Sequence, residues 1–181
     1  NGGGLYSQKG KIHYLNFVGN TATNGGGLYL PNARDVIECT FSANTARDKG
    51  GAISLNGNST IDKSNFANNS AKNGGAIYNN NVLTINNTNF KGDHAYSGGA
   101  IQISDDLDIH NTNFEDNVAT DGTNYINLIG DVKITLDNIT PKHVNPYKVS
   151  VITITYATNG TAYGDNAYVA LKVFGENKPL T

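Results

Sequence analysis

The sequence lacks the features that mark several large classes of protein. It holds one cysteine, Cys39, so no disulfide can form within the chain, and we expect that thiol to act as a small buried side chain. No apolar run is long enough to cross a bilayer, which predicts no direct insertion of this chain into a membrane. The net charge is −2 and no basic stripe occurs, which argues against a nucleic-acid partner.

Charged and hydrophobic residues are also scarce, at 15% and 38% of the chain, so a large globular core is not the obvious solution. Proline is rare, at 4 residues, whereas there are 21 glycines and 28 asparagines. Glycine and asparagine tolerate positive φ, so this composition indicates many tight corners rather than a flexible linker. No signal peptide is present, and we expect the chain to be a fragment of a larger exported protein.

What the sequence does contain is a repeat of about 24 residues. Phenylalanine is followed three residues later by asparagine or aspartate in five copies, which predicts a repeat protein. These pairs are Phe17/Asn20, Phe41/Asn44, Phe66/Asn69, Phe90/Asp93 and Phe114/Asn117. A glycine pair followed by apolar residues runs in phase with them and starts in the first copy at Gly3. The later pairs are Gly26-Gly27, Gly50-Gly51, Gly74-Gly75 and Gly98-Gly99, with a degenerate copy at Gly122.

Short strands account for the rest of each repeat. Segments such as 82–85 and 106–109 alternate apolar and polar residues, a period of two that is typical of strands, and no stretch has a helical period. Each repeat therefore holds about three short strands and sharp corners. An aliphatic residue stands five positions before each repeat phenylalanine, at Ile12, Val36, Ile61, Ile85 and Ile109.

A unit this small cannot fold alone, but stacked units bury a continuous core. The sequence thus predicts an all-β fold, a right-handed single-stranded parallel β-helix of about six coils, because only that geometry keeps every copy in register. The phenylalanines form one inner column, and Cys39 stands in another with Leu15, Ser64, Thr88 and Thr112. A further inner column is expected at Tyr6, Tyr29, Ile53, Ile77, Ile101 and Tyr125.

The repeat asparagines are expected to shape the corners of the coil. A corner near the left-handed region suits asparagine, and its side-chain amide can also bond its stacked neighbours. The residues predicted to take this conformation are Asn20, Asn44, Asn69 and Asn117.

The repeat fades after residue 139, and the pattern changes beyond two prolines, Pro141 and Pro146. We therefore predict a β-helix domain over 1–140, a linker over 141–146 and part of an immunoglobulin-like β-sandwich over 147–181. A complete sandwich of that type needs about 100 residues, so the second domain is expected to be truncated.

The Phe-x-x-Asn and Gly-Gly-Ala-Ile motifs resemble the repeats of bacterial polymorphic outer-membrane proteins. Segments 73–79 and 83–90 are similar, more closely, to the Asn-rich repeats of adhesin-like surface proteins of methanogenic archaea, and 163–166 with 176–181 look like the start of an immunoglobulin-like repeat. The resemblance implies a pectate-lyase-like solenoid in an extracellular protein of the cell surface. It implies attachment to glycans, or to a protein receptor on another cell, and it carries over no catalytic or cofactor residues.

Two alternatives stay open, a non-binding stalk and a polysaccharide lyase or glycoside hydrolase of the β-helix type. An enzyme needs clustered carboxylates and a basic residue near the sugar. The best acidic cluster is Asp105, Asp106 and Asp108, while the arginines, Arg34 and Arg47, lie two or three coils away. We therefore predict no catalysis and no required cofactor. Asp105 and Asp106 are a candidate Ca²⁺ site, set against a simple solvated acidic corner.

Some outward-facing residues could carry or bind sugar. Sequons that permit N-glycosylation begin at Asn58, Asn68, Asn86, Asn138 and Asn159. Tyr78 and Tyr96 could stack on sugar rings, although scattered surface tyrosines are equally ordinary.

Overall fold

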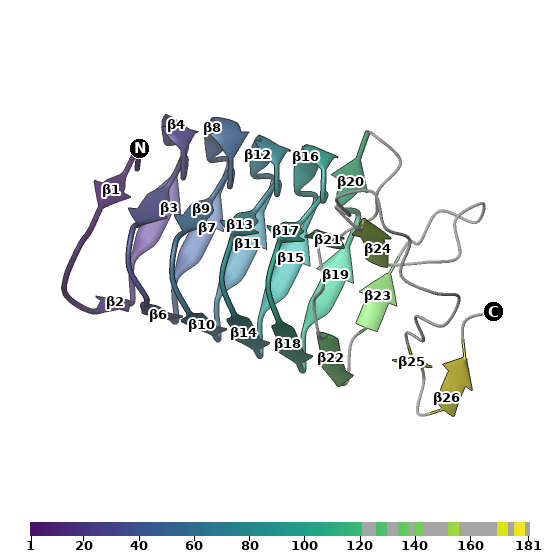
Figure 1. Cartoon of the computed structure of the whole chain (residues 1–181). Coiled ribbons are helices and arrows are strands. Elements are labelled where there is room, and N and C mark those ends of the chain that lie inside the picture. Colours follow the sequence, from purple (N-terminus) through teal and green to yellow (C-terminus); the bar gives the residue numbers. More distant parts are fainter. Residues whose placement is uncertain are drawn as a thin grey trace, which may run out of the picture.

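The computed structural model describes residues 1–120, 126–129, 134–137, 140–142, 152–155, 170–173 and 176–179. Over this part the chain is all β, and no helix occurs that could cross a membrane. Residues 1–120 wind through five turns of about 24 residues, and each turn places one short strand in each of four parallel sheets, here named A to D. Figure 1 shows these turns stacked along one axis.

Sheets A and B form two of the walls. Sheet A contains β1 (Leu5–Tyr6), β5 (Leu28–Leu30), β9 (Ile53–Leu55), β13 (Ile77–Asn79), β17 (Ile101–Ile103), β21 (Ile126–Ile129) and β24 (Ile152–Thr155). Sheet B contains β2 (Ile12–His13), β6 (Asp35–Ile37), β10 (Ser59–Asp62), β14 (Leu83–Asn86), β18 (Leu107–His110) and β22 (Ile134–Asp137).

Sheets C and D complete each turn. Sheet C contains β3 (Asn16–Val18), β7 (Thr40–Ser42), β11 (Asn65–Ala67), β15 (Asn89–Lys91), β19 (Asn113–Glu115) and β23 (Thr140–Lys142). Sheet D contains β4 (Thr21–Asn24), β8 (Thr45–Lys49), β12 (Ser70–Asn73), β16 (His94–Ser97) and β20 (Val118–Ala119). The sequence predicts about three strands per repeat, and sheet D is the fourth. The apolar residue that its strands bury is at most an alanine, such as Ala71, and this is too weak an apolar signal to mark a strand.

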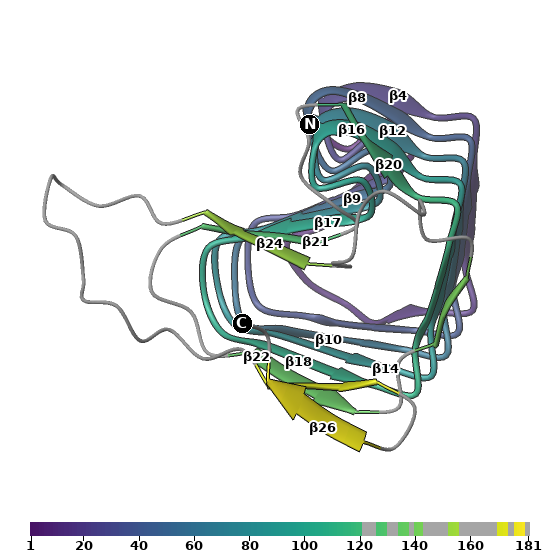
Figure 2. The ribbon, with the colours of Figure 1, turned by 90° about the vertical axis from the view of Figure 1, so that its right-hand side faces the viewer.

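The hand of the coil follows from Figure 2, which looks along the axis from the C-terminal end. The chain passes from sheet A through B, C and D and back to A counterclockwise while it advances toward the viewer. Such a path is a right-handed coil, the hand expected for parallel crossover connections. The predicted right-handed parallel β-helix is therefore confirmed.

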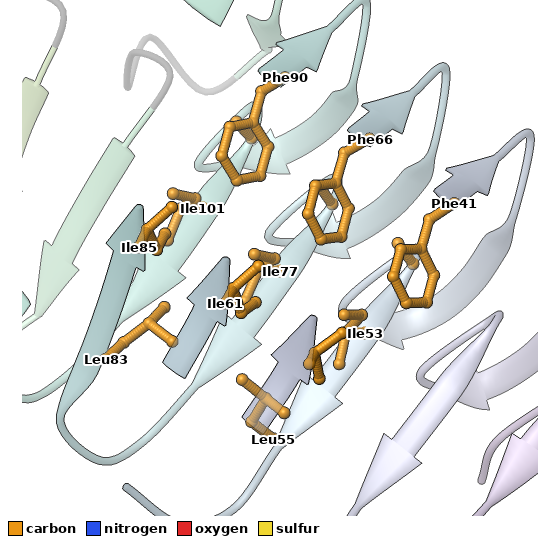
Figure 3. Close-up of a cluster of buried hydrophobic side chains, with 14 of the residues drawn as sticks. Phe41, Ile53, Leu55, Ile61, Phe66, Ile77, Leu83, Ile85, Phe90 and Ile101 are labelled. Atoms are coloured by element: carbon orange, nitrogen blue, oxygen red, sulfur yellow. The ribbon is translucent and has the colours of Figure 1, made fainter. Parts of the chain in front are cut away.

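The core consists of columns of like residues, one from each turn (Figure 3). Phe17, Phe41, Phe66, Phe90 and Phe114 stack with ring centroids 4.8–5.0 Å apart and nearly parallel planes. This separation is the spacing between neighbouring strands, so the backbone ladder itself fixes the ring stack. A second column on sheet A faces it, made of Leu5, Leu28, Ile53, Ile77, Ile101 and Ile126.

The register of this second column corrects the prediction in the first two turns. Leu28 pairs with Ile53, and Tyr29 pairs with Ser54, so Tyr6 and Tyr29 point outward. The cause is β8, which has five residues where β4 and β12 have four, with a register shift on both sides. An extra residue offsets the count by one. Tyr125 is not among the described residues, and its neighbour Ile126 continues the column.

The same offset moves the glycine pair of the second turn. Gly25 and Gly26, rather than the predicted Gly26-Gly27, occupy the positions of Gly50 and Gly51, and Gly27 stands at the place of Ala52. These turns need glycine for two reasons. In the fourth turn Gly74 has φ +65°, and a Cβ on Gly75 would clash with the Gly99 carbonyl oxygen. The first position demands left-handed backbone, and the second demands close backbone contact.

The corner between sheets C and D carries an internal asparagine ladder. Asn44 Nδ2 donates to Asn69 Oδ1 over 3.0 Å and to the Phe17 carbonyl oxygen over 2.9 Å, and the Asn44 backbone N–H also donates to Asn69 Oδ1. Asn69 bonds Asp93 in the same way. Each buried amide thus satisfies backbone groups that the corner leaves unpaired.

The ladder extends to the first and fifth turns. The backbone N–H and the Nδ2 of Asn20 donate to Asn44 Oδ1, over 3.0 and 2.9 Å, although Asn20 itself is only half-buried at the open end of the coil. Asn117 is buried, its Oδ1 accepts from the Asp93 backbone N–H over 3.0 Å, and its Nδ2 donates to the Phe90 carbonyl oxygen over 3.1 Å. The predicted bonding between stacked neighbours is therefore present in every one of the five turns.

The predicted conformation of these corner asparagines is wrong. Asn20, Asn44, Asn69 and Asn117 are not in the left-handed region, because the residue before each of them takes that conformation instead. Those preceding residues are Gly19 with φ 66°, Ala43 with φ 54°, Asn68 with φ 55° and Asp116 with φ 54°, and Gly92 with φ 65° precedes Asp93 in the same way. The left-handed residue makes the bend, and the ladder side chain that follows points inward and fills it.

The predicted linker over 141–146 and sandwich over 147–181 lie mainly outside the described residues, so the domain boundary stays a prediction. Among the described strands, β23 pairs in parallel with β19, and β24 pairs in parallel with β21. β25 (Ala170–Val173) and β26 (Glu176–Pro179) form an antiparallel pair.

Candidate functional site

The outer face of sheet C presents an exposed ladder of side-chain amides. Asn89 Nδ2 donates to Asn65 Oδ1 over 2.9 Å, and Asn113 Nδ2 donates to Asn89 Oδ1 over 2.8 Å. A side-chain amide has two N–H donors and two oxygen lone pairs. One donor and one lone pair are used within the ladder, so one donor and one lone pair remain for solvent or a ligand. All three residues are exposed, so donors and acceptors repeat outward at the strand spacing of about 4.8 Å.

A second column on the same face is nearly neutral. It runs through Val18, Ser42, Ala67, Lys91 and Glu115. Lys91 Nζ lies 3.0 Å from Glu115 Oε1, because the 24-residue spacing places the two residues side by side on neighbouring strands. The hydrogen bond that Lys91 donates to Glu115 raises the pKa of Lys91 and so favours its charged form. The face is therefore polar with little net charge.

The two tyrosines proposed to stack on sugars differ in access. Tyr96 lies on β16 in sheet D and is 58% exposed. Tyr78 lies on the outer side of β13 and is half-buried, and the Lys49 ammonium sits 4.7 Å from its ring centroid. Because the cation already covers that ring, Tyr96 is the more available of the two.

His94, His110 and the two arginines are divided between sheets B and D. His94 is on β16 in sheet D, whereas His110 is on β18 in sheet B. Arg47 is on β8 in sheet D, and Arg34 precedes β6 in sheet B. The described residues therefore show no single groove that combines these groups.

Asp105 and Asp106 lie at the corner between sheets A and B in the fifth turn. The Asp106 backbone N–H donates to Asp105 Oδ1 over 2.8 Å, so one carboxylate oxygen supports the local bend. Within the described ranges, no group of three or more His, Cys, Asp or Glu residues could hold a metal ion.

The candidate Ca²⁺ site predicts that millimolar CaCl₂ raises the melting temperature by a few degrees, because an ion that binds only the folded state stabilises it by mass action. Asp105→Asn should remove that increase, and MgCl₂ at the same concentration controls for ionic strength. Thermal unfolding followed by circular dichroism measures both. A melting temperature that does not change with Ca²⁺ eliminates the site.

Asp93 is the described residue whose titration the fold perturbs most. It replaces asparagine in the internal ladder and is fully buried. Its Oδ1 accepts from Asn69, but its Oδ2 has no hydrogen-bond partner. Burial raises the pKa of Asp93 to about 7, against the weaker opposing effect of the Asn69 hydrogen bonds. A perturbed carboxyl group can mark an active site, but this one has no access to solvent, so its role is structural.

The sequon asparagines and Cys39 differ in how exposed their side chains are. Asn58 and Asn68 are exposed and Asn86 is half-buried, whereas Asn138 and Asn159 lie outside the described residues. Cys39 is buried, and its Sγ lies 3.3 Å from the Ile37 carbonyl oxygen. Burial raises the pKa of this thiol, which keeps it protonated and unreactive.

Comparison with known proteins bears on the repeat. Residues 38–56 and 63–80 match the repeat of Chlamydia polymorphic membrane proteins. The chain is similar to these repeats over about a fifth of its length. Each matched segment contains one Phe-x-x-Asn corner and one glycine turn, and it ends one residue after a strand of sheet A, β9 or β13. No curated protein and no solved structure matches the chain. The matched repeat and the stacked strands fit a surface repeat scaffold of the parallel β-helix type.

Proposed function

We propose that this chain is part of an extracellular, adhesin-like cell-surface protein that attaches to other cells or to polysaccharide through its rigid solenoid. The observation that supports this most is the exposed amide ladder of Asn65, Asn89 and Asn113. Side-chain amides with free donors and acceptors pair well with sugar hydroxyl groups, and a nearly neutral face suits neutral sugars.

The repeat supplies the physical basis for attachment. A single exposed amide contributes little affinity, because it exchanges bonds to water for bonds to ligand. A stiff rod holds many such groups in register, however, so weak contacts to a repeating polymer sum by avidity. Similarity to a membrane-protein repeat and the stacked fold are consistent with such a scaffold. The proposed likeness to archaeal adhesin-like proteins with immunoglobulin-like repeats belongs to the same hypothesis.

A glycan and polysaccharide array tests the proposal, with release of reducing or unsaturated ends read in the same wells. We expect binding without product. Replacing both Asn65 and Asn89 with alanine should weaken that binding by about tenfold, since two outward hydrogen-bonding groups are lost. The control replaces Asn80, which is also exposed but lies between β13 and β14 in the fourth turn, away from sheet C.

The outcomes separate the alternatives. Product release would replace the adhesin with a lyase or hydrolase. Absence of any glycan binding would favour a stalk, or attachment to a protein receptor. An equal loss of binding in the control variant would show that the sheet C ladder has no special part.

A further inference from the structure

A hollow lies where the chain passes from sheet A to sheet B in the first three turns. Its volume is about 460 Å³, within the range of small-molecule sites. Three successive turns line it, with Lys11 and His13 from the first, Arg34, Asp35 and Ile37 from the second, and Asn58 from the third. The turns are far apart in sequence, so only stacking brings these side chains together.

Arg34 is held in the wall of this hollow by two hydrogen bonds, which leave three of its five N–H donors unused. Its Nη2 donates to the carbonyl oxygen of Gln8, and its Nη1 to that of Ala33 over 3.4 Å. Its Nε–H is buried and has no hydrogen-bond partner. Nη1 and Nη2 each keep a second N–H that these two bonds do not use, and such a group can donate to an acidic ligand that enters the hollow. The anchored guanidinium is also already oriented, so little side-chain entropy is lost on binding.

The side chains that line the hollow carry a net positive charge, which favours an anionic ligand. Lys11 and Arg34 bring two positive charges and Asp35 one negative charge, in a chain whose net charge is −2. Neither cation forms an ion pair with a carboxylate in the part of the chain that the structure describes. Both charges are therefore available to a ligand, and Asp35 opposes the ligand only in part.

An aromatic ring lies against His13, which is one of the residues that line the hollow. Tyr14 follows His13, their rings meet edge to face with centroids 6.2 Å apart, and Tyr14 is 72% exposed. An exposed aromatic face next to a cationic hollow suits a ligand with an apolar ring face and an acidic substituent. A sugar that carries a carboxylate or a sulfate has both.

We propose that this hollow binds the acidic group of an anionic polysaccharide, with Arg34 and Lys11 holding the oxyanion and Tyr14 stacking on the sugar ring. This inference rests on the proposed function, since it assigns a ligand class and a second position to glycan attachment. It differs from the sheet C ladder in requiring charge on the ligand.

Isothermal titration of the whole chain with oligogalacturonate, dextran sulfate and neutral dextran tests the assignment. We expect at least one anionic probe to bind about tenfold or more tightly than dextran, and 0.5 M NaCl to remove that preference. Arg34→Gln should weaken binding of the anionic probe by about tenfold or more, because a charge-assisted hydrogen bond is lost. Lys11→Gln should weaken it by a few-fold, and Asp35→Asn should strengthen it by a few-fold, since each alters one nearby charge.

Arg47→Gln is the matched control, because Arg47 is the other arginine, is exposed, and lies on sheet D. Lys11→Gln keeps the test valid if Arg34→Gln fails to fold, since Lys11 is exposed.

Equal binding of dextran and both anionic probes would overturn this inference and leave the proposed function intact. Equal losses in Arg47→Gln and Arg34→Gln would also overturn it, because general charge would then suffice. Failure of the wild-type chain to bind any of the three probes would overturn this inference, whereas the proposed function is decided by the wider glycan array. A preference for oligogalacturonate or for dextran sulfate would identify the acidic group as carboxylate or sulfate.

Discussion

Replacing Asp93 with asparagine is expected to stabilise the folded protein at pH 8 by on the order of 2–4 kcal/mol. In the ladder, Asn44 Nδ2 donates both to the next ladder residue and to a phenylalanine carbonyl oxygen. The equivalent atom of Asp93 is Oδ2, which is buried and unpartnered. Ionised Asp93 therefore brings a desolvated charge and no donor to a place built for an amide. Asparagine would restore the missing donor and carry no charge.

The pH dependence of stability follows from the same group. Folding raises the pKa of Asp93 from 3.8 to about 7, so the folded protein holds this proton more tightly than the unfolded chain does. The stabilising contribution is therefore fully present below about pH 4, declines as the pH rises toward about 7, and is absent above that. The steepest decline is about 1.4 kcal/mol per pH unit. The Asp93→Asn protein should lack this decline, so its advantage over wild type is small at pH 4 and largest at pH 8.

Urea unfolding at pH 4, 6 and 8 measures the difference between the two proteins. Asp116→Asn is the matched control, because Asp116 is an exposed aspartate in the next turn. That variant should track wild type at every pH. If Asp93→Asn is no more stable than wild type at pH 8, Asp93 is not an ionised defect in the ladder.

Phe66→Ala is expected to destabilise the solenoid by about 3–5 kcal/mol, the usual cost of removing a fully buried phenylalanine. Phe66 is 1% exposed and stacks on Phe41 and on Phe90, with centroids 4.9 and 4.8 Å away. Truncation would leave a cavity between two rings whose positions are set by the backbone ladder, so the column cannot collapse to fill it. In a solenoid each turn is stabilised by its neighbours, so the cavity weakens two interfaces at once.

Thermal and denaturant unfolding of Phe66→Ala, Phe66→Leu and Phe17→Ala would measure this effect. Phe66→Leu retains most of the volume and should cost clearly less. Phe17→Ala should also cost less, because Phe17 is 6% exposed and stacks on Phe41 alone among the described residues. Equal losses for Phe17→Ala and Phe66→Ala would show that stacking from both sides adds nothing.

Much of the fold was predictable because its strongest signals are local and repeated. Phe41, Phe66 and Phe90 recur at a nearly constant interval, and stacking at the strand spacing is the arrangement that buries all of them. The sequence predicts the register of the strands less well where the interval between repeats changes. The fifth residue of β8 moves Leu28 and Tyr29 by one position, and the run of three glycines before Leu28 fits either alignment.

The corners were predictable in their bonding but not in their backbone. Asn20 and Asn117 bond the neighbouring turn as their spacing predicts, yet Gly19 and Asp116 before them take the positive φ. Glycine, alanine, asparagine and aspartate all occur at that preceding position, so its residue type carries no consistent signal. The repeated asparagine marks the corner, and only the backbone shows which of its residues bends.

The candidate sites were predictable to a smaller extent. Lys91 and Glu115 pair as the offset predicts, because both lie in regular strands. Sequence spacing placed Arg34 away from the acidic cluster, but it did not place Arg34 beside Lys11 and His13. Lys11 and Arg34 stand in the loops that lead from sheet A to sheet B, and His13 lies in β2 directly after such a loop. The length of these loops varies from turn to turn, so periodicity gives no register there.

The sequence by itself determined the parallel β-helix, because a repeat this short must stack its apolar columns to obtain a core, and its phenylalanines and isoleucines recur with strand periodicity. Only the tertiary structure decided which polar groups the stacking buries and which it leaves in contact with solvent. It encloses Asp93 in an amide ladder, covers the ring of Tyr78 with Lys49, and assembles a cationic hollow around Arg34. Each outcome depends on contacts between turns about 24 residues apart, which no local pattern along the chain encodes.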